Sequence, residues 1–149
     1  YDPEDDFPTH FNAQGAVTTF YNKHHGGEFL AVHAEGGPTR AQPFRLGNAR
    51  AIETVRTLDS VATRSPEAVY VHLVNRGTKQ SAEVVVDLSK VAGDGEATLR
   101  WLEAVAPEEV DANGGWMKED ARPVEVRNGE ARLTIPPTTV AILEVPRAM

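Results

Sequence analysis

The sequence contains no cysteine, which excludes disulfides and metal sites with thiolate ligands. No apolar run approaches the roughly 18 residues needed to span a bilayer. Lysine and arginine form no cluster, and 22 acidic against 15 basic residues give a formal net charge of −7. We therefore expect neither nucleic acid nor a membrane as a partner. The choice between a cytoplasmic and a secreted location stays open.

A second absence concerns the start of the chain, which is Tyr1 rather than methionine and shows no signal peptide. We expect this end to be a processing site or the edge of a fragment. The length of 149 residues is sufficient for one domain that buries roughly two-thirds of its unfolded surface. The sequence divides this length into an acidic linker with an amphipathic helix over residues 1–27 and a β-sandwich over residues 28–149.

One convincing helix is predicted, from about His10 to His25. Its aromatic and aliphatic residues recur at three- and four-residue spacing and form one apolar stripe. The pair Gly26-Gly27 is typical of a helix C-cap. So aromatic a stripe needs a surface to cover it, and we expect a docking face made by Phe11, Val17, Phe20 and Tyr21.

The remainder predicts short strands separated by turn residues, the pattern of an antiparallel two-sheet β-sandwich of about eight to nine strands. The fold class is therefore all-β, with one helix before the sandwich. Asn128-Gly129 lies between two alternating runs and is the strongest hairpin signal. The predicted strands are Glu28–Ala34, Ala51–Ser60, Ala68–Asn75, Ala82–Leu88, Ala97–Val105, Pro123–Val126, Ala131–Ile135 and Thr139–Val145.

No pattern predicts a catalytic centre. The adjacent acids Asp5-Asp6, Glu108-Glu109 and Glu119-Asp120 lie in polar connecting segments, where such pairs are usually solvated. The five histidines have no HExxH spacing, and no phosphate or dinucleotide fingerprint is present. We expect no metal and no cofactor, and the sequence assigns no catalytic residue.

The two tryptophans deserve separate treatment because sugars stack on flat aromatic faces. Trp101 shares a strand face with Ala97 and Leu99, which favours core packing. Trp116 follows two glycines in a long connection, and burial as an anchor is favoured over a sugar platform. If this protein binds sugar, Trp116 and Asn113 are the candidate contact residues.

Several segments resemble the C-terminal part of a family 51 α-L-arabinofuranosidase, a retaining glycoside hydrolase. They are LDSVATRS at 58–65, VNR at 74–76, VVVDLS at 84–89, LEAVAPEEVDANGG at 102–115 and IPPTTVAILEV at 135–145. The resemblance implies a β-sandwich that follows a catalytic (β/α)8 barrel, with the predicted helix similar to the last barrel helix. Motifs around the family's two catalytic glutamates are matched nowhere in this sequence.

The first functional interpretation is therefore a non-catalytic accessory domain that buttresses a catalytic barrel. Its expected partners are that barrel, as a domain or a separate chain, and plant-cell-wall polysaccharide such as hemicellulose. A free-standing carbohydrate-binding module and a sandwich used for protein assembly are the alternatives. The helix favours the first interpretation, because a binding module has no need of an aromatic amphipathic helix at its entry.

Overall fold

The computed structural model describes residues 13–42, 44–45, 47–48 and 50–147, and antiparallel strands make up most of them. The helices are α1 (Ala13–Lys23), the 3-10 turn η1 (Pro107–Glu109) and the short α2 (Val110–Asn113). The strands are β1 (Glu28–Leu30), β2 (Thr39–Gln42), β3 (Ile52–Arg56), β4 (Leu58–Arg64), β5 (Ala68–Asn75), β6 (Ala82–Asp87), β7 (Gly95–Ala104), β8 (Met117–Arg127), β9 (Glu130–Ile135) and β10 (Thr139–Pro146).

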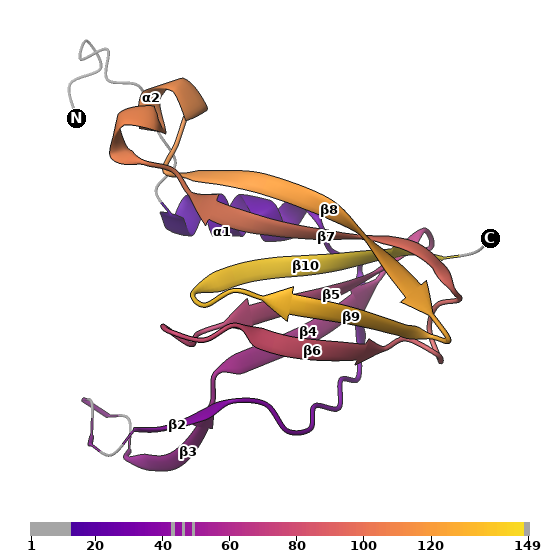
Figure 1. Cartoon of the computed structure of the whole chain (residues 1–149), viewed down its shortest axis with the longest axis horizontal. Helices are drawn as coiled ribbons and strands as arrows, with labels where there is room; N and C mark the ends of the chain where they lie inside the picture. Colours follow the sequence, from indigo (N-terminus) through magenta and orange to yellow (C-terminus); the bar gives the residue numbers. More distant parts are fainter. Residues whose placement is uncertain (1–12, 43, 46, 49, 148–149) are drawn as a thin grey trace.

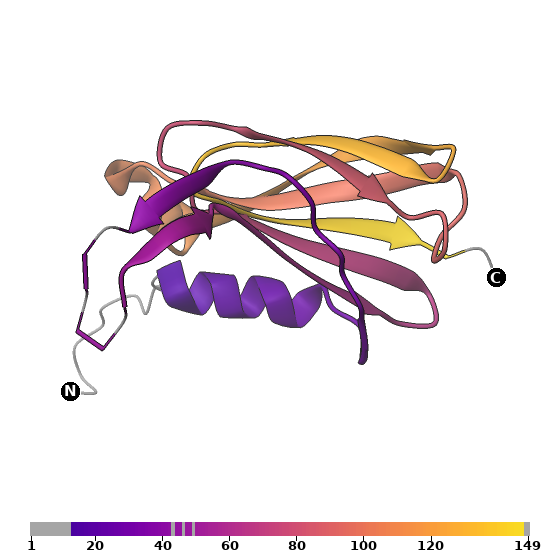
Figure 2. The ribbon, with the colours of Figure 1, turned by 90° about the horizontal axis from the view of Figure 1, so that it is seen from below.

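Eight of the strands form one antiparallel sheet in the order β1-β4-β5-β10-β7-β8-β9-β6. This sheet curls over itself, so that β9 and β6 lie across from β5 and β4 (Figure 1). The two layers of the predicted sandwich are thus the two halves of one continuous sheet. The all-β antiparallel class and the helix before it are confirmed. A separate two-stranded sheet, β2 with β3, extends from one end (Figure 2).

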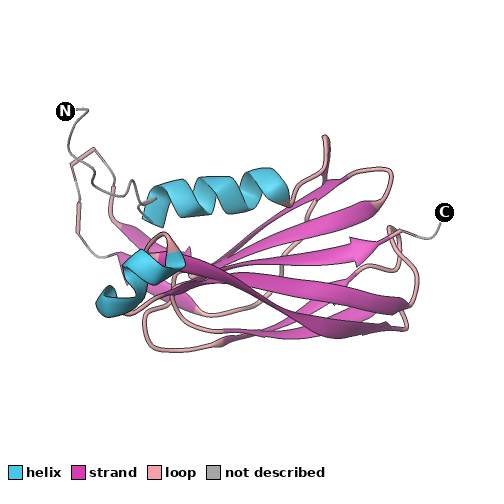
Figure 3. Ribbon diagram, turned by 90° about the horizontal axis from the view of Figure 1, so that it is seen from above, coloured by secondary structure: helices cyan, strands magenta, loops and turns pink. Residues whose placement is uncertain are grey.

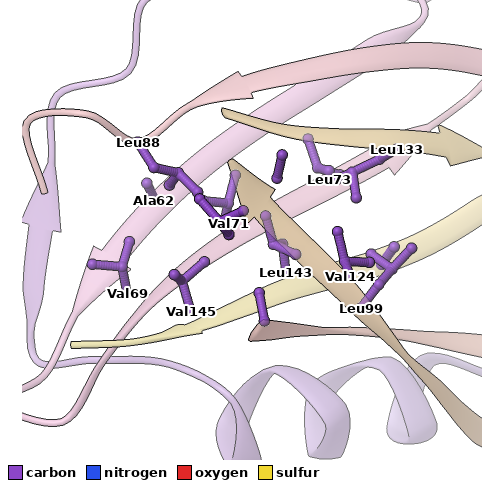
Figure 4. Packing of buried hydrophobic residues seen from close by; sticks show 14 of the residues in the cluster. Ala62, Val69, Val71, Leu73, Leu88, Leu99, Val124, Leu133, Leu143 and Val145 are labelled. Carbon is purple, nitrogen blue, oxygen red and sulfur yellow. The ribbon is translucent and has the colours of Figure 1, made fainter. Parts of the chain in front are cut away.

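The core fills the inside of the curl. Strand residues alternate between the two faces of a sheet, and the inward set is aliphatic in each main strand. Val71, Leu99, Leu133 and Leu143 come from four different strands and converge in this interior, as Figure 4 shows. Burying each such side chain is worth roughly 1.5–3 kcal/mol.

The hairpin predicted at Asn128-Gly129 joins β8 to β9 and is confirmed by its backbone. Both residues have positive φ, 52° at Asn128 and 74° at Gly129. Two left-handed residues between paired strands give the turn whose twist matches a hairpin. Glycine is also required here for space, since a Cβ at Gly129 would lie 2.8 Å from the Cβ of Ser89.

Several predicted strand boundaries are wrong. The strand predicted over Glu28–Ala34 ends at Leu30, and β2 was not predicted. The segment predicted as one strand over Ala51–Ser60 divides at buried Thr57 into β3 and β4. Its backbone N–H donates to the Pro38 carbonyl while its own carbonyl accepts from Arg76, which turns the chain between sheets. In addition, β8 starts at Met117 rather than Pro123, because its charged first half pairs in register with β7.

Helix α1 ends at Lys23, and the glycine pair after it plays a different part from the predicted C-cap. Neither Gly26 nor Gly27 has positive φ. Gly26 instead allows two backbones to meet, because a Cβ there would lie 1.9 Å from the Arg64 carbonyl carbon. Its N–H donates to Thr63 Oγ1 at 2.9 Å. This close approach holds the end of α1 against β4.

Candidate functional site

The best-defined surface feature is the outer face of the sheet where α1 crosses it (Figure 3). Phe20 is 2% exposed and packs on Leu102 of β7 and Ile142 of β10, both of which point away from the main core. Together these residues form a second apolar cluster. Its partly buried members are Val17, Tyr21, Tyr70, Met117 and Val140.

This packing changes how the predicted docking face is understood. Phe20 is covered by the chain's own sheet, so it is unavailable to a separate barrel. Val17 and Tyr21 contact the same cluster and are only partly buried. Phe11 lies outside the described residues. Docking of the rest of α1 on a barrel stays a prediction.

An ionic network links the end of α1 to the sheet. The His24 imidazole lies 2.9 Å from a carboxylate oxygen of Glu119 and 3.8 Å from one of Glu144. Arg100 donates to both acids, at 3.4 Å to Glu119 and 2.9 Å to Glu144. All four side chains are 14–29% exposed, so water screens them less than it screens ordinary surface pairs. The network fixes the helix over β7, β8 and β10.

His72 of β5 lies under the same helix and is 8% exposed. Its ring is 5.1 Å from the Tyr21 ring, and its Nε2 is 3.5 Å from Thr63 Oγ1. Burial is the main cause that lowers the pKa of His72, and the positive charges of His25 and His24 lower it further. Burial also raises the pKa of the Tyr21 hydroxyl. Both groups are therefore held in their neutral forms near neutral pH.

Beside His72 the outer face opens into a groove with a volume of about 540 Å³. One wall is Tyr21 of α1 with His25 just after the helix, and the floor is formed by His72 and Val74 of β5. Phe29 of β1 and Val61 of β4 line it and are 79% and 49% exposed. The sequence did not predict this groove, because its residues come from four segments that only the pairing register brings together.

The predicted sugar contacts lie elsewhere, in the connection between β7 and β8. The favoured burial of Trp116 is wrong, since this residue is 47% exposed. The connection is anchored instead by buried Val110 and by the Asn113 side-chain amide, which donates to the carbonyls of Gly115 and Met117 at 2.7 and 3.0 Å. Sugar contact by Trp116 and Asn113 stays a prediction.

Trp101 behaves as its strand position predicts. It is partly buried and packs against the main core, and its indole N–H donates to Glu103 at 2.8 Å. The two tryptophans therefore differ in role, because one belongs to a strand face and the other to a loop.

The acidic pairs show no shared arrangement. Asp5-Asp6 lie outside the described residues, Glu108-Glu109 are exposed on η1, and Glu119 belongs to the network while Asp120 is exposed. Over the described part of the chain, no three His, Asp or Glu residues are grouped so that they could hold a metal ion. None of the helices within those residues has the length and apolar character needed to cross a membrane.

Comparison with known proteins gives a likeness of fold. No protein-family model matches the chain, and no curated protein matches it. An α-L-arabinofuranosidase from Thermotoga maritima, solved with arabinose, matches with a TM-score of 0.69 at 17% identity over 89% of this chain. A thermostable GH51 α-L-arabinofuranosidase from Thermotoga petrophila matches with 0.65 at 18% identity over 84%. An arabinose-bound GH51 α-L-arabinofuranosidase matches with 0.65 at 14% identity over 99%.

The coverage in the other direction is small, because the chain spans 28%, 27% and 21% of these three structures. The resemblance noted in the sequence is therefore confirmed as a likeness of fold to a part of such enzymes. At these identities, function does not transfer with the fold.

Proposed function

We propose that this chain is a non-catalytic accessory β-sandwich domain of a glycoside hydrolase that resembles α-L-arabinofuranosidases, and that it buttresses a catalytic (β/α)8 barrel. The supporting observation is the asymmetry of coverage. The likeness includes 84–99% of this chain but only 21–28% of each matched enzyme. The matched fold therefore accounts for nearly all of this chain but for a small part of each enzyme. Such a small domain is suited to supporting a larger catalytic domain.

The geometry of the chain favours the same role. Retaining glycosidases need two carboxyl groups about 5–5.5 Å apart across a sugar. Glu119 and Glu144 are brought together by the fold, and both are bonded to Arg100 and face the end of α1. Their contacts with Arg100 and His24 hold a helix in place.

The test compares this chain with the full product of its gene, using nitrophenyl arabinofuranoside and nitrophenyl xyloside. We expect turnover by the full product and none by this chain. Turnover by this chain that disappears when one Asp or Glu is replaced would refute the proposal. A full product without a barrel would refute it as well.

A second candidate, a carbohydrate-binding module, is favoured by one observation, the exposure of Trp116. An aromatic face with a few polar neighbours is the requirement of a weak sugar site. Titration with arabinan and xylan fragments, followed by tryptophan fluorescence, tests it. A saturable change that Trp116→Ala abolishes without lowering the melting temperature would support this function.

A further inference from the structure

The outer face that carries α1 continues beyond the helix as an uncovered apolar surface. The pairing register places Phe29 opposite Thr63 on β1 and β4, and Val61 opposite His72 on β4 and β5. Both rows run on under α1, where His72 pairs with Ile142 of β10. The helix therefore covers one part of a face whose remaining part, with Phe29 79% and Val61 49% exposed, stays open.

Such exposure calls for a partner. Sheets whose strands are apolar on both faces are normally covered on both sides, and a clustered apolar surface beside a groove is typical of an interaction site. Val85 on β6 is 52% exposed as well, but it is not among the residues that line this groove. The groove of about 540 Å³ is large enough to receive side chains from a second element placed beside α1.

We propose that this groove, lined by Phe29, Val61, Val74 and His72, is where the sandwich docks on the catalytic barrel, through a barrel helix that lies beside α1. This inference rests on the proposed function. Helices form the outer ring of a (β/α)8 barrel, so an amphipathic helix is the element such a partner presents. The docked surface then continues the packing that α1 already makes with the same face.

Two other occupants fit the groove less well. Two polar groups that line the groove are already engaged, since Thr63 Oγ1 accepts the Gly26 N–H and Asp59 is paired with Arg76 at 3.0 Å. The exposed apolar side chains of Phe29 and Val61 favour a protein partner over a sugar. A second copy of this chain would bring two net charges of −7 together, which opposes self-association. The matched structures have more than 70% of their length outside this fold. A large further domain fits that length, and the barrel of the proposed function is therefore the remaining candidate.

The test uses the absence of cysteine in this chain. Val61→Cys introduces a thiol in the groove, and Val85→Cys introduces a control thiol of similar exposure on β6. Each variant is prepared as this chain and as the full gene product, and labelling by a maleimide is followed by mass spectrometry. We expect the Val61→Cys thiol to react at least tenfold more slowly in the full product, and the Val85→Cys thiol to react equally in both.

Each outcome bears on the proposal. Equal labelling of the Val61→Cys thiol in both forms would overturn it, even when the full product hydrolyses arabinofuranoside and the proposed function stands. Protection that appears in this chain as its concentration rises would assign the groove to a second copy. Protection that appears in this chain only when xylan or arabinan fragments are added would assign it to a sugar. Inactivity of the full product would instead count against the proposed function itself.

Discussion

The two halves of the curled sheet treat their outer faces differently. Under α1, the half formed by β5, β10 and β7 presents Tyr70, Ile142 and Leu102 outward, and α1 buries Ile142 and Leu102 and partly covers Tyr70. The other half, made by β9, β6 and the second part of β8, presents charged side chains that pair along their own strands, such as Arg132 with Glu130 at 2.9 Å. The outer face of one half is therefore apolar and covered by α1, and the outer face of the other half is charged and exposed to water.

The burial patterns along the strands differ between the two halves in the same way. Along β9, buried and exposed residues alternate strictly, as expected when one side faces solvent. Along β5 and β10, buried and intermediate residues follow one another almost without interruption. Continuous apolar runs in an antiparallel sheet thus indicate which strands a helix covers.

The largest expected effect comes from removing the contact on which the covered face depends. Phe20→Ala should lower the free energy of unfolding by about 3–5 kcal/mol, because it deletes a buried aromatic ring and leaves a cavity between α1 and the sheet. Urea unfolding followed by circular dichroism measures it. The matched control on the water-facing half, Val85→Ala, should change stability by no more than about 0.5 kcal/mol. Similar losses for both variants would contradict the comparison.

The next effect tests the close approach at the end of α1. Gly26→Ala should cost about 1–3 kcal/mol, since the added methyl would lie 1.9 Å from the Arg64 backbone and the helix must shift. Gly27→Ala is the control, because a Cβ there has no neighbour within 4 Å. Thermal melts of both variants decide the matter. Equal melting temperatures would show that the helix end is not held by this contact.

A smaller effect distinguishes the ion pairs of the two faces. Arg100→Met should destabilise the fold by about 1–2 kcal/mol, because it leaves Glu119 and Glu144 together in a half-buried site. Arg132→Met breaks a pair in which Arg132 is 76% exposed, and its effect should stay within about 0.5 kcal/mol. Added salt should weaken the second pair more than the first. The idea fails if the two variants are equally stable.

The smallest expected effect is a pH dependence of the stability, which comes from His72 on the face that α1 covers. Because the pKa of His72 is lower in the folded chain than in the unfolded chain, the unfolded chain takes up this proton first as the pH falls. Stability should therefore decrease below about pH 6.5, and His72→Gln should remove that part of the dependence. Unfolding titrations at several pH values compare the two proteins. Parallel pH profiles would show that His72 does not contribute.

Much of the fold could be predicted from local pattern. Alternation identified β9, and Asn128-Gly129 identified the hairpin before it, because both signals lie within a few neighbouring residues. The division at Thr57 could not be predicted. It depends on bonds to Pro38 and Arg76, each 19 residues away, and no local pattern carries them.

The site residues were harder to predict for the same physical reason. The sequence identified the apolar stripe of α1 but not the surface that it packs on. Leu102 and Ile142 form that surface, and in the sequence they are indistinguishable from other apolar strand residues. Arg100 and Glu144 are 44 positions apart and meet only through the register of β7 with β10. Trp116 was misjudged because the sequence does not show that Asn113 and Val110 already anchor its loop.

The position of β10 has a consequence for the order in which the fold can assemble. This strand lies between β5 and β7 in the sheet, yet it follows both in the chain. In a nascent chain that has not reached Thr139, the strands β1-β4-β5 and the strands β7-β8-β9-β6 have no strand pairing between them. Residues 139–146 then join them through eight pairs with β5 and four with β7. During synthesis on the ribosome, the native sheet must therefore wait for this strand to emerge from the exit tunnel.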